Sequence, residues 1–86
     1  MSKEEFYGVL INPIGEKLTQ LRGFRFYDEK IKREVGEFSL VVGDPIDLGL
    51  NEFRIGRMRS GIVNVTEFDI EKNTGVFVLE GKWFGQ

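Results

Sequence analysis

The 86-residue sequence contains no histidine and no cysteine. Without cysteine the chain has no disulfide bonds and no thiolate metal ligands, and thiol catalysis is excluded. Without histidine it lacks the side chain that titrates nearest neutral pH, which excludes Ser-His-Asp catalysis and imidazole-bound zinc. We therefore expect a non-catalytic protein with no cofactor and no metal site.

Long apolar runs are also missing. No segment approaches the roughly 18–20 apolar residues that cross a bilayer, and the charged start, Met1 to Glu5, leads into no hydrophobic stretch of the kind found in signal peptides. These features predict a cytoplasmic protein that makes no membrane contact. The small size, the eleven glycines and the lack of motifs would also suit a viral accessory protein.

Aromatic residues supply the material for a core. Eight Phe, two Tyr and one Trp are present, and each such ring buries a large area. A chain of this length hides roughly 60–65% of its unfolded surface, so the core is thin but real. We expect one domain, residues 1–86.

Short aromatic and β-branched runs separated by Gly, Asp, Asn and Pro predict a mainly β fold. The expected strands are Phe6–Ile11, Phe24–Tyr27, Ile31–Val42, Glu52–Arg59, Ile62–Glu71 and Val76–Phe84. About six strands at this spacing predict a small β-barrel, similar to OB or SH3 barrels, or a two-layer β structure.

Two local departures from this pattern are expected. Ile14, Leu18 and Leu21 recur at helical spacing, which predicts one short helix near residues 15–22. In the long third strand the apolar positions change parity around Gly36. This change predicts a bulge or bend at that glycine.

The segment 52–71 reads as a β-hairpin with Ser60-Gly61 as its two-residue turn. That turn would place Phe53 opposite Phe68 and Arg54 opposite Glu67, both favourable cross-strand pairs. The apolar residues near the tip of this hairpin are Met58, Val63 and Val65. In this register they face the side of the hairpin opposite to the apolar residues near its base. Either a bulge at Gly56 reconciles the two sets, or the tip is a contact with another subunit or partner protein.

Arginines gather in two blocks of the sequence, Arg54, Arg57 and Arg59 in one and Arg22 and Arg25 in the other. Aromatic residues accompany the second block; they are Phe24, Phe26 and Tyr27. Single-stranded nucleic acid binds to grooves that combine such cations with stacking rings. The simpler interpretation is that the arginines pair with carboxylates on the next strand, namely Glu67, Asp69 and Glu71.

Three hypotheses about function follow, of which the third, an enzyme or metal binder that uses carboxylates, is the least favoured. The favoured one is a non-catalytic protein-interaction or assembly module, with a protein partner or self-association through the 52–71 hairpin and an interface at Met58, Val63 and Val65. The alternative is a small barrel that binds single-stranded RNA or DNA through its arginines. A calcium or magnesium site on the carboxylates is disfavoured, because no D-x-D-x-D-G loop occurs.

Overall fold

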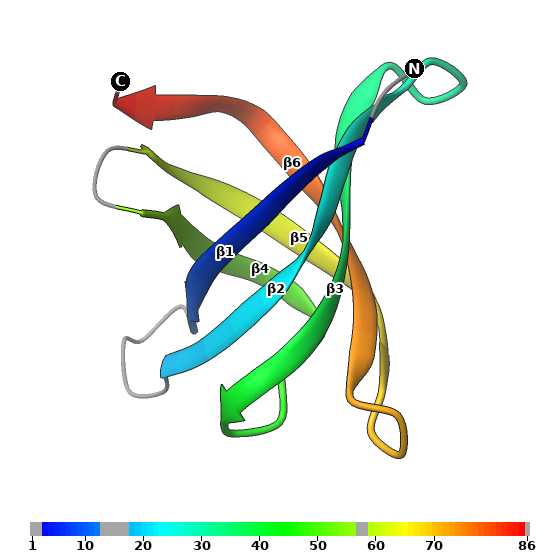
Figure 1. Cartoon of the computed structure of the whole chain (residues 1–86). Coiled ribbons are helices and arrows are strands. Elements are labelled where there is room, and N and C mark those ends of the chain that lie inside the picture. The colour runs from blue at the N-terminus through cyan, green and yellow to red at the C-terminus, as the bar shows by residue number, and fades with distance from the viewer. Residues whose placement is uncertain (1–2, 13–17, 57–58, 86) are drawn as a thin grey trace.

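The computed structural model describes residues 3–12, 18–56 and 59–85. They form six strands and no helix. The strands are β1 (Glu4–Ile11), β2 (Leu18–Asp28), β3 (Arg33–Gly43), β4 (Gly49–Ile55), β5 (Arg59–Asp69) and β6 (Thr74–Gly85). They close into one barrel in the order β1-β2-β3-β6-β5-β4, with every pair antiparallel (Figure 1). The prediction of a small β-barrel is thus confirmed.

The barrel consists of two halves, each a meander of three consecutive strands. The first half is β1 to β3 and the second is β4 to β6. Two seams join the halves, where β1 pairs with β4 and β3 pairs with β6. The chain crosses between the halves through residues 44–48, flanked by Gly43 and Gly49, both with positive φ.

Alternation along the strands fills the barrel with aromatic rings and aliphatic side chains. The largest wholly buried side chains are Phe53, Phe77, Leu21, Val63 and Val65. Phe53 and Phe77 lie with their ring centroids 5.1 Å apart, and Phe6 contacts both rings. The prediction that aromatic residues form the core is confirmed.

Interior glycines make room for these rings. A Cβ atom on Gly8 would lie 2.6 Å from the Cζ of Phe53, and one on Gly75 would lie 2.6 Å from the Cζ of Phe38. Gly36 leaves space for the Phe77 ring in the same way. Each of these glycines belongs to one half of the barrel and faces an aromatic ring from the other half. The two halves therefore pack together by placing large side chains against glycines.

A polar cluster occupies one end of the interior. The guanidinium of Arg25, whose side chain is 10% exposed, binds Glu34 at 2.9 Å and Glu4 at 3.1 Å. The indole Nε1 of Trp83 donates a hydrogen bond of 2.6 Å to Glu34, and Gly61 leaves space for the indole ring. The buried charge of Arg25 is therefore paired, as a charge in a low-dielectric site needs to be.

The loop between the halves caps the opposite end. Ile46 is buried in the core cluster. The hydroxyl of Thr19 donates to the carbonyl of Asp44 at 2.9 Å, and the amide of Asn51 donates to the carbonyls of Asp47 and Gly49. These side chains satisfy loop carbonyls that strand pairing leaves free.

The helix expected near residues 15–22 is wrong for the part that the structure describes, since residues 18–22 belong to β2. Residues 15–17 lie outside the described part. Leu21 is buried opposite Leu40, whereas Leu18 is exposed. The two leucines lie on opposite faces of β2 by ordinary strand alternation, and the register shift between Gln20 and Leu21 places an extra residue, Val41, in β3.

The turn expected at Ser60-Gly61 is also wrong. Both residues lie inside β5, where they pair with Arg54 and Phe53. The strands are joined instead through Gly56, which has φ of 60°, and residues 57–58, which lie outside the described part. The predicted pairs of Phe53 with Phe68 and of Arg54 with Glu67 are therefore absent from the register.

The bend expected at Gly36 is not a break in pairing, because β3 keeps its register there with both neighbouring strands. Apolar parity changes for another reason. Val35 lies on the outer side of β3, between Phe26 and Val78 of the adjacent strands, and is buried there. The turn that the sequence predicts at Asp28-Glu29-Lys30 is confirmed, at residues 29–32. The turn predicted at Asn73-Thr74-Gly75 instead lies at residues 70–73, because Thr74 and Gly75 already belong to β6.

Candidate binding surfaces on the barrel exterior

The structure does not bring the predicted arginines together. Arg25 lies inside the barrel in its ion pairs, while Arg22, three residues earlier, lies on the outer face of β2. Arg54 lies on the outer face of β4 and pairs with Glu52 of the same strand at 2.9 Å. Arg59 is exposed at the start of β5, and Arg57 lies outside the described residues. A continuous basic groove through all of them is therefore not formed by the described residues.

The alternative pairing of these arginines with the carboxylates of residues 67–71 is not observed among the described residues either. Arg54 pairs with Glu52, and Arg25 pairs with Glu4 and Glu34. Asp69 instead accepts backbone N–H groups in the turn that follows β5, from Glu71 at 3.0 Å and from Lys72 at 3.2 Å. The accompanying aromatics Phe24 and Tyr27 are half exposed, not core.

The two described residues of the predicted apolar interface, Val63 and Val65, are buried and do not lie on the surface. Val63 and Val65 are 0% and 1% exposed and belong to the barrel core. They cannot contact a partner while the barrel is folded. Met58 lies outside the described residues. The register explains the placement, because it pairs Gly61 with Phe53 and Val63 with Asn51, so that Gly61, Val63 and Val65 share the inner side of β5.

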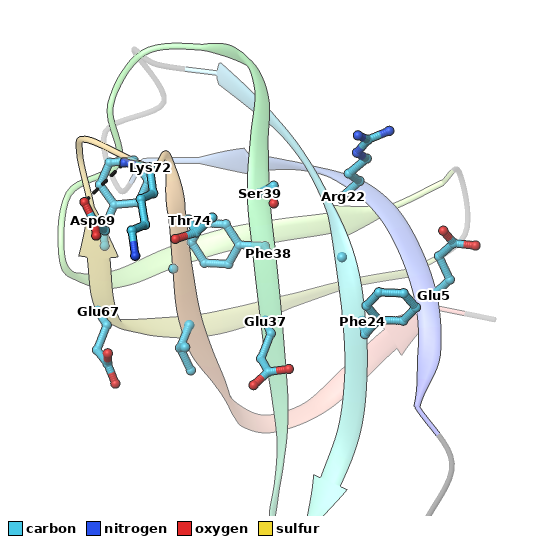
Figure 2. A pocket seen from close by; sticks show the side chains of 14 residues that line it. Glu5, Arg22, Phe24, Glu37, Phe38, Ser39, Glu67, Asp69, Lys72 and Thr74 are labelled. Atoms are coloured by element: carbon cyan, nitrogen blue, oxygen red, sulfur yellow. Dashed lines mark hydrogen bonds between the residues drawn. The ribbon is translucent and has the colours of Figure 1, made fainter.

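An open pocket of about 780 Å³, here called the outer groove, crosses the exterior of the barrel (Figure 2). One row of side chains crosses five neighbouring strands; in register it reads Glu5, Phe24, Glu37, Val76, Glu67. A second, polar row beside it reads Arg22, Ser39, Thr74, Asp69. Strands lie about 4.8 Å apart, so the first row is roughly 19 Å long.

The first row alternates carboxylates with apolar groups. Phe24, 47% exposed, lies between Glu5 and Glu37, and Val76 lies between Glu37 and Glu67. Figure 2 shows the labelled members, Glu5, Phe24, Glu37 and Glu67, side by side across the strands.

Two of the groove's four carboxylates have neither an ion-pair nor a hydrogen-bond partner among the described residues. Glu37 pairs with Lys3 at 3.0 Å, a contact in which both side chains are half exposed, and Asp69 is held by its turn. No described side chain pairs with Glu5 or Glu67. The groove as a whole contains four carboxylates and two cations, Arg22 and Lys72, so it favours a positively charged ligand.

A second, smaller pocket of about 280 Å³, here called the rim pocket, lies where β6 ends and β5 begins. Its lining consists of Glu52, Arg54, Gly56, Arg59, Ser60, Phe84 and Gly85. Phe84 is 64% exposed and pairs in register with Ser60. This pocket contains two of the five predicted arginines together with an exposed ring.

Sequence reasoning missed the outer groove because its row joins strands that are distant in the chain. Glu37 and Val76 become neighbours only because β3 pairs with β6. No pattern within a short stretch of the sequence predicts that pairing. Phe84 had a readable signal, since it lies near the end of an otherwise buried strand, where side chains emerge from the core.

Within the described ranges, no group of three or more acidic side chains is placed to hold a metal ion. No helix long and apolar enough to cross a membrane occurs in the same part of the chain. Comparisons with protein-family models, curated proteins and solved structures gave no match. Function has to be inferred from the chain's own surfaces.

Proposed function

We propose that this barrel is a non-catalytic protein-interaction module, and that its outer groove binds a basic, partly apolar segment of a partner protein. The observation that carries the proposal is the row in which Glu5, Glu37 and Glu67 alternate with exposed apolar groups. Lysine or arginine side chains of the partner would meet the carboxylates, and its apolar side chains would cover Phe24 and Val76.

The closure of the barrel supports binding through side chains. At the centre of the row Phe24, Glu37 and Val76 are paired on both sides, so the strands offer no free backbone groups there with which a partner could extend a sheet. The hydroxyls of Ser39 and Thr74, in the second row of the groove, supply hydrogen bonds for the partner's backbone.

The groove can be tested with two labelled peptides of about ten residues, one alternating lysine with leucine and one alternating glutamate with leucine. We expect the lysine peptide to bind in fluorescence anisotropy and the glutamate peptide not to bind. Because each lost charge contact weakens binding by up to about tenfold, the double variant Glu5→Gln/Glu67→Gln should bind markedly less tightly than the unmodified protein.

Glu29→Gln is the matched control, since Glu29 is an exposed carboxylate in the turn after β2, outside the groove. It removes the same kind of charge and should leave peptide binding unchanged. The proposal fails if the lysine peptide does not bind at low salt, or if Glu29→Gln weakens binding as much as the groove substitutions do.

A further inference from the structure

The rim pocket is separate from the outer groove. Ser60 and Glu67 lie seven residues apart along β5, which corresponds to roughly 23 Å of strand. The two pockets thus occupy opposite ends of the β5–β6 hairpin, and they have no lining residue in common. What binds at one end need not affect the other.

Both rim arginines keep donors free. Arg54 uses its Nε–H for Glu52, which leaves the four N–H groups of its terminal nitrogens without a described partner. Arg59 is exposed and forms no ion pair with a described side chain. Arg54 is opposite Ser60 and Arg59 is opposite Ile55 in the β4–β5 register, and Arg54, Arg59 and Ser60 all line the pocket at this end of the hairpin.

Phe84 adds a flat apolar surface to these donors. Its ring has no stacking or edge contact with another described aromatic ring. Approach to it is open, because Phe84 is 64% exposed. A pocket of about 280 Å³ lies just below the roughly 300–1000 Å³ of common ligand sites. Its size suits a single unit of a chain.

We propose that the rim pocket binds one nucleotide of a single-stranded nucleic acid, with a phosphate on Arg54 and Arg59 and the base stacked on Phe84. Arginine forks match phosphate oxygens, and base stacking on an aromatic ring needs no particular sequence. The strand is single because the faces of paired bases are already covered in a duplex. This site retains two of the five arginines that the sequence suggested, and it is independent of the peptide-binding function.

The test is fluorescence anisotropy with three labelled strands of about twelve units: oligo-dT, oligo-U and an abasic strand with the same phosphates. We expect oligo-dT and oligo-U to bind more tightly than the abasic strand, by about fivefold or more per stacked base. Binding should weaken with salt, and Arg59→Gln should reduce the magnitude of the salt slope by about 0.7.

Phe84→Leu removes the flat ring but keeps an apolar side chain, and should abolish the preference for strands that carry bases. Arg33→Gln is the matched control, because Arg33 is an exposed arginine paired with Glu80 away from the pocket. Thermal melting confirms that each variant is folded. Absence of binding at low salt, equal binding of the abasic strand by the unmodified protein, or an equal loss in Arg33→Gln would each overturn the proposal.

Discussion

The second and third strands of each half, β2 and β3 in one and β5 and β6 in the other, are joined by turns of the same geometry. In the turn after β2, the N–H of Lys32 donates to the carbonyl of Asp28 at 2.7 Å, and in the turn after β5 the N–H of Asn73 donates to the carbonyl of Asp69, also at 2.7 Å. Lys32 and Asn73 both have φ of 57°. In each turn the aspartate side chain also accepts the N–H two residues later.

The strands that leave these two turns bury different chemistry. The β2–β3 arm encloses the ion pair of Arg25 with Glu34, whereas the β5–β6 arm encloses Phe77 and Val65. One turn design therefore supports a charged interior in one half and an apolar interior in the other. The turn is set by local backbone geometry and an aspartate, while strand alternation sets what the core contains.

The largest expected effect lies in the apolar half. Phe77→Ala removes a ring that contacts Phe6, Phe38 and Phe53, and should lower the free energy of unfolding by about 3–5 kcal/mol. Urea denaturation followed by Trp83 fluorescence measures it. Ile70→Ala, at an exposed site, is the control and should change little. A loss below about 1 kcal/mol for Phe77→Ala would show that this half is not organised around its ring.

A smaller loss is expected in the charged half. Glu34→Leu leaves the buried guanidinium of Arg25 with only the exposed carboxylate of Glu4, and takes from the indole N–H of Trp83 its acceptor; it should cost about 2–3 kcal/mol. The double variant Arg25→Met/Glu34→Leu removes both charges and should be more stable than Glu34→Leu alone. If the double variant were the less stable of the two, the pair would be a net stabilising contact, contrary to this prediction.

The smallest effect, and the sharpest comparison, concerns the turns. Asp28→Ala removes the acceptor of one backbone N–H group, and Asp69→Ala removes the acceptor of two, the second at a longer 3.2 Å, so each should lower the free energy of unfolding by about 1 kcal/mol. The two losses should agree within about 0.5 kcal/mol, since the bonds are exposed in both turns. Unequal losses in urea denaturation would mean that the surrounding strands, not the local turn, decide its stability.

The sequence predicts well those features that depend on neighbouring residues. An aspartate begins both matching turns, Asp28 in one and Asp69 in the other, and aromatic and β-branched runs mark the strands. The helix near 15–22 fails because Leu18 and Leu21, three positions apart, lie on opposite faces of a regular strand, one exposed and one buried. The Ser60-Gly61 turn fails because Gly61 is small for another reason, the space it leaves for Trp83.

The candidate sites depend on strand order, which is why they were predicted less well. Arg22 and Arg25 are close in sequence but lie on opposite sides of β2, since side chains three positions apart alternate faces. Val63 and Val65 change from interface to core when the turn moves. Arg54, Arg59 and Phe84 meet only through the pairing of β4 and β6 with β5.

The seams between the halves have a consequence for the order of folding. Within each meander, pairing joins strands that follow one another along the chain, but the seams join Val35 to Val78 and Gly8 to Ile55. Bringing such distant segments together has a higher entropic cost than closing a turn. We expect each meander to collapse first and the barrel to close last, so the rate at which the seams form should limit how fast this small chain folds.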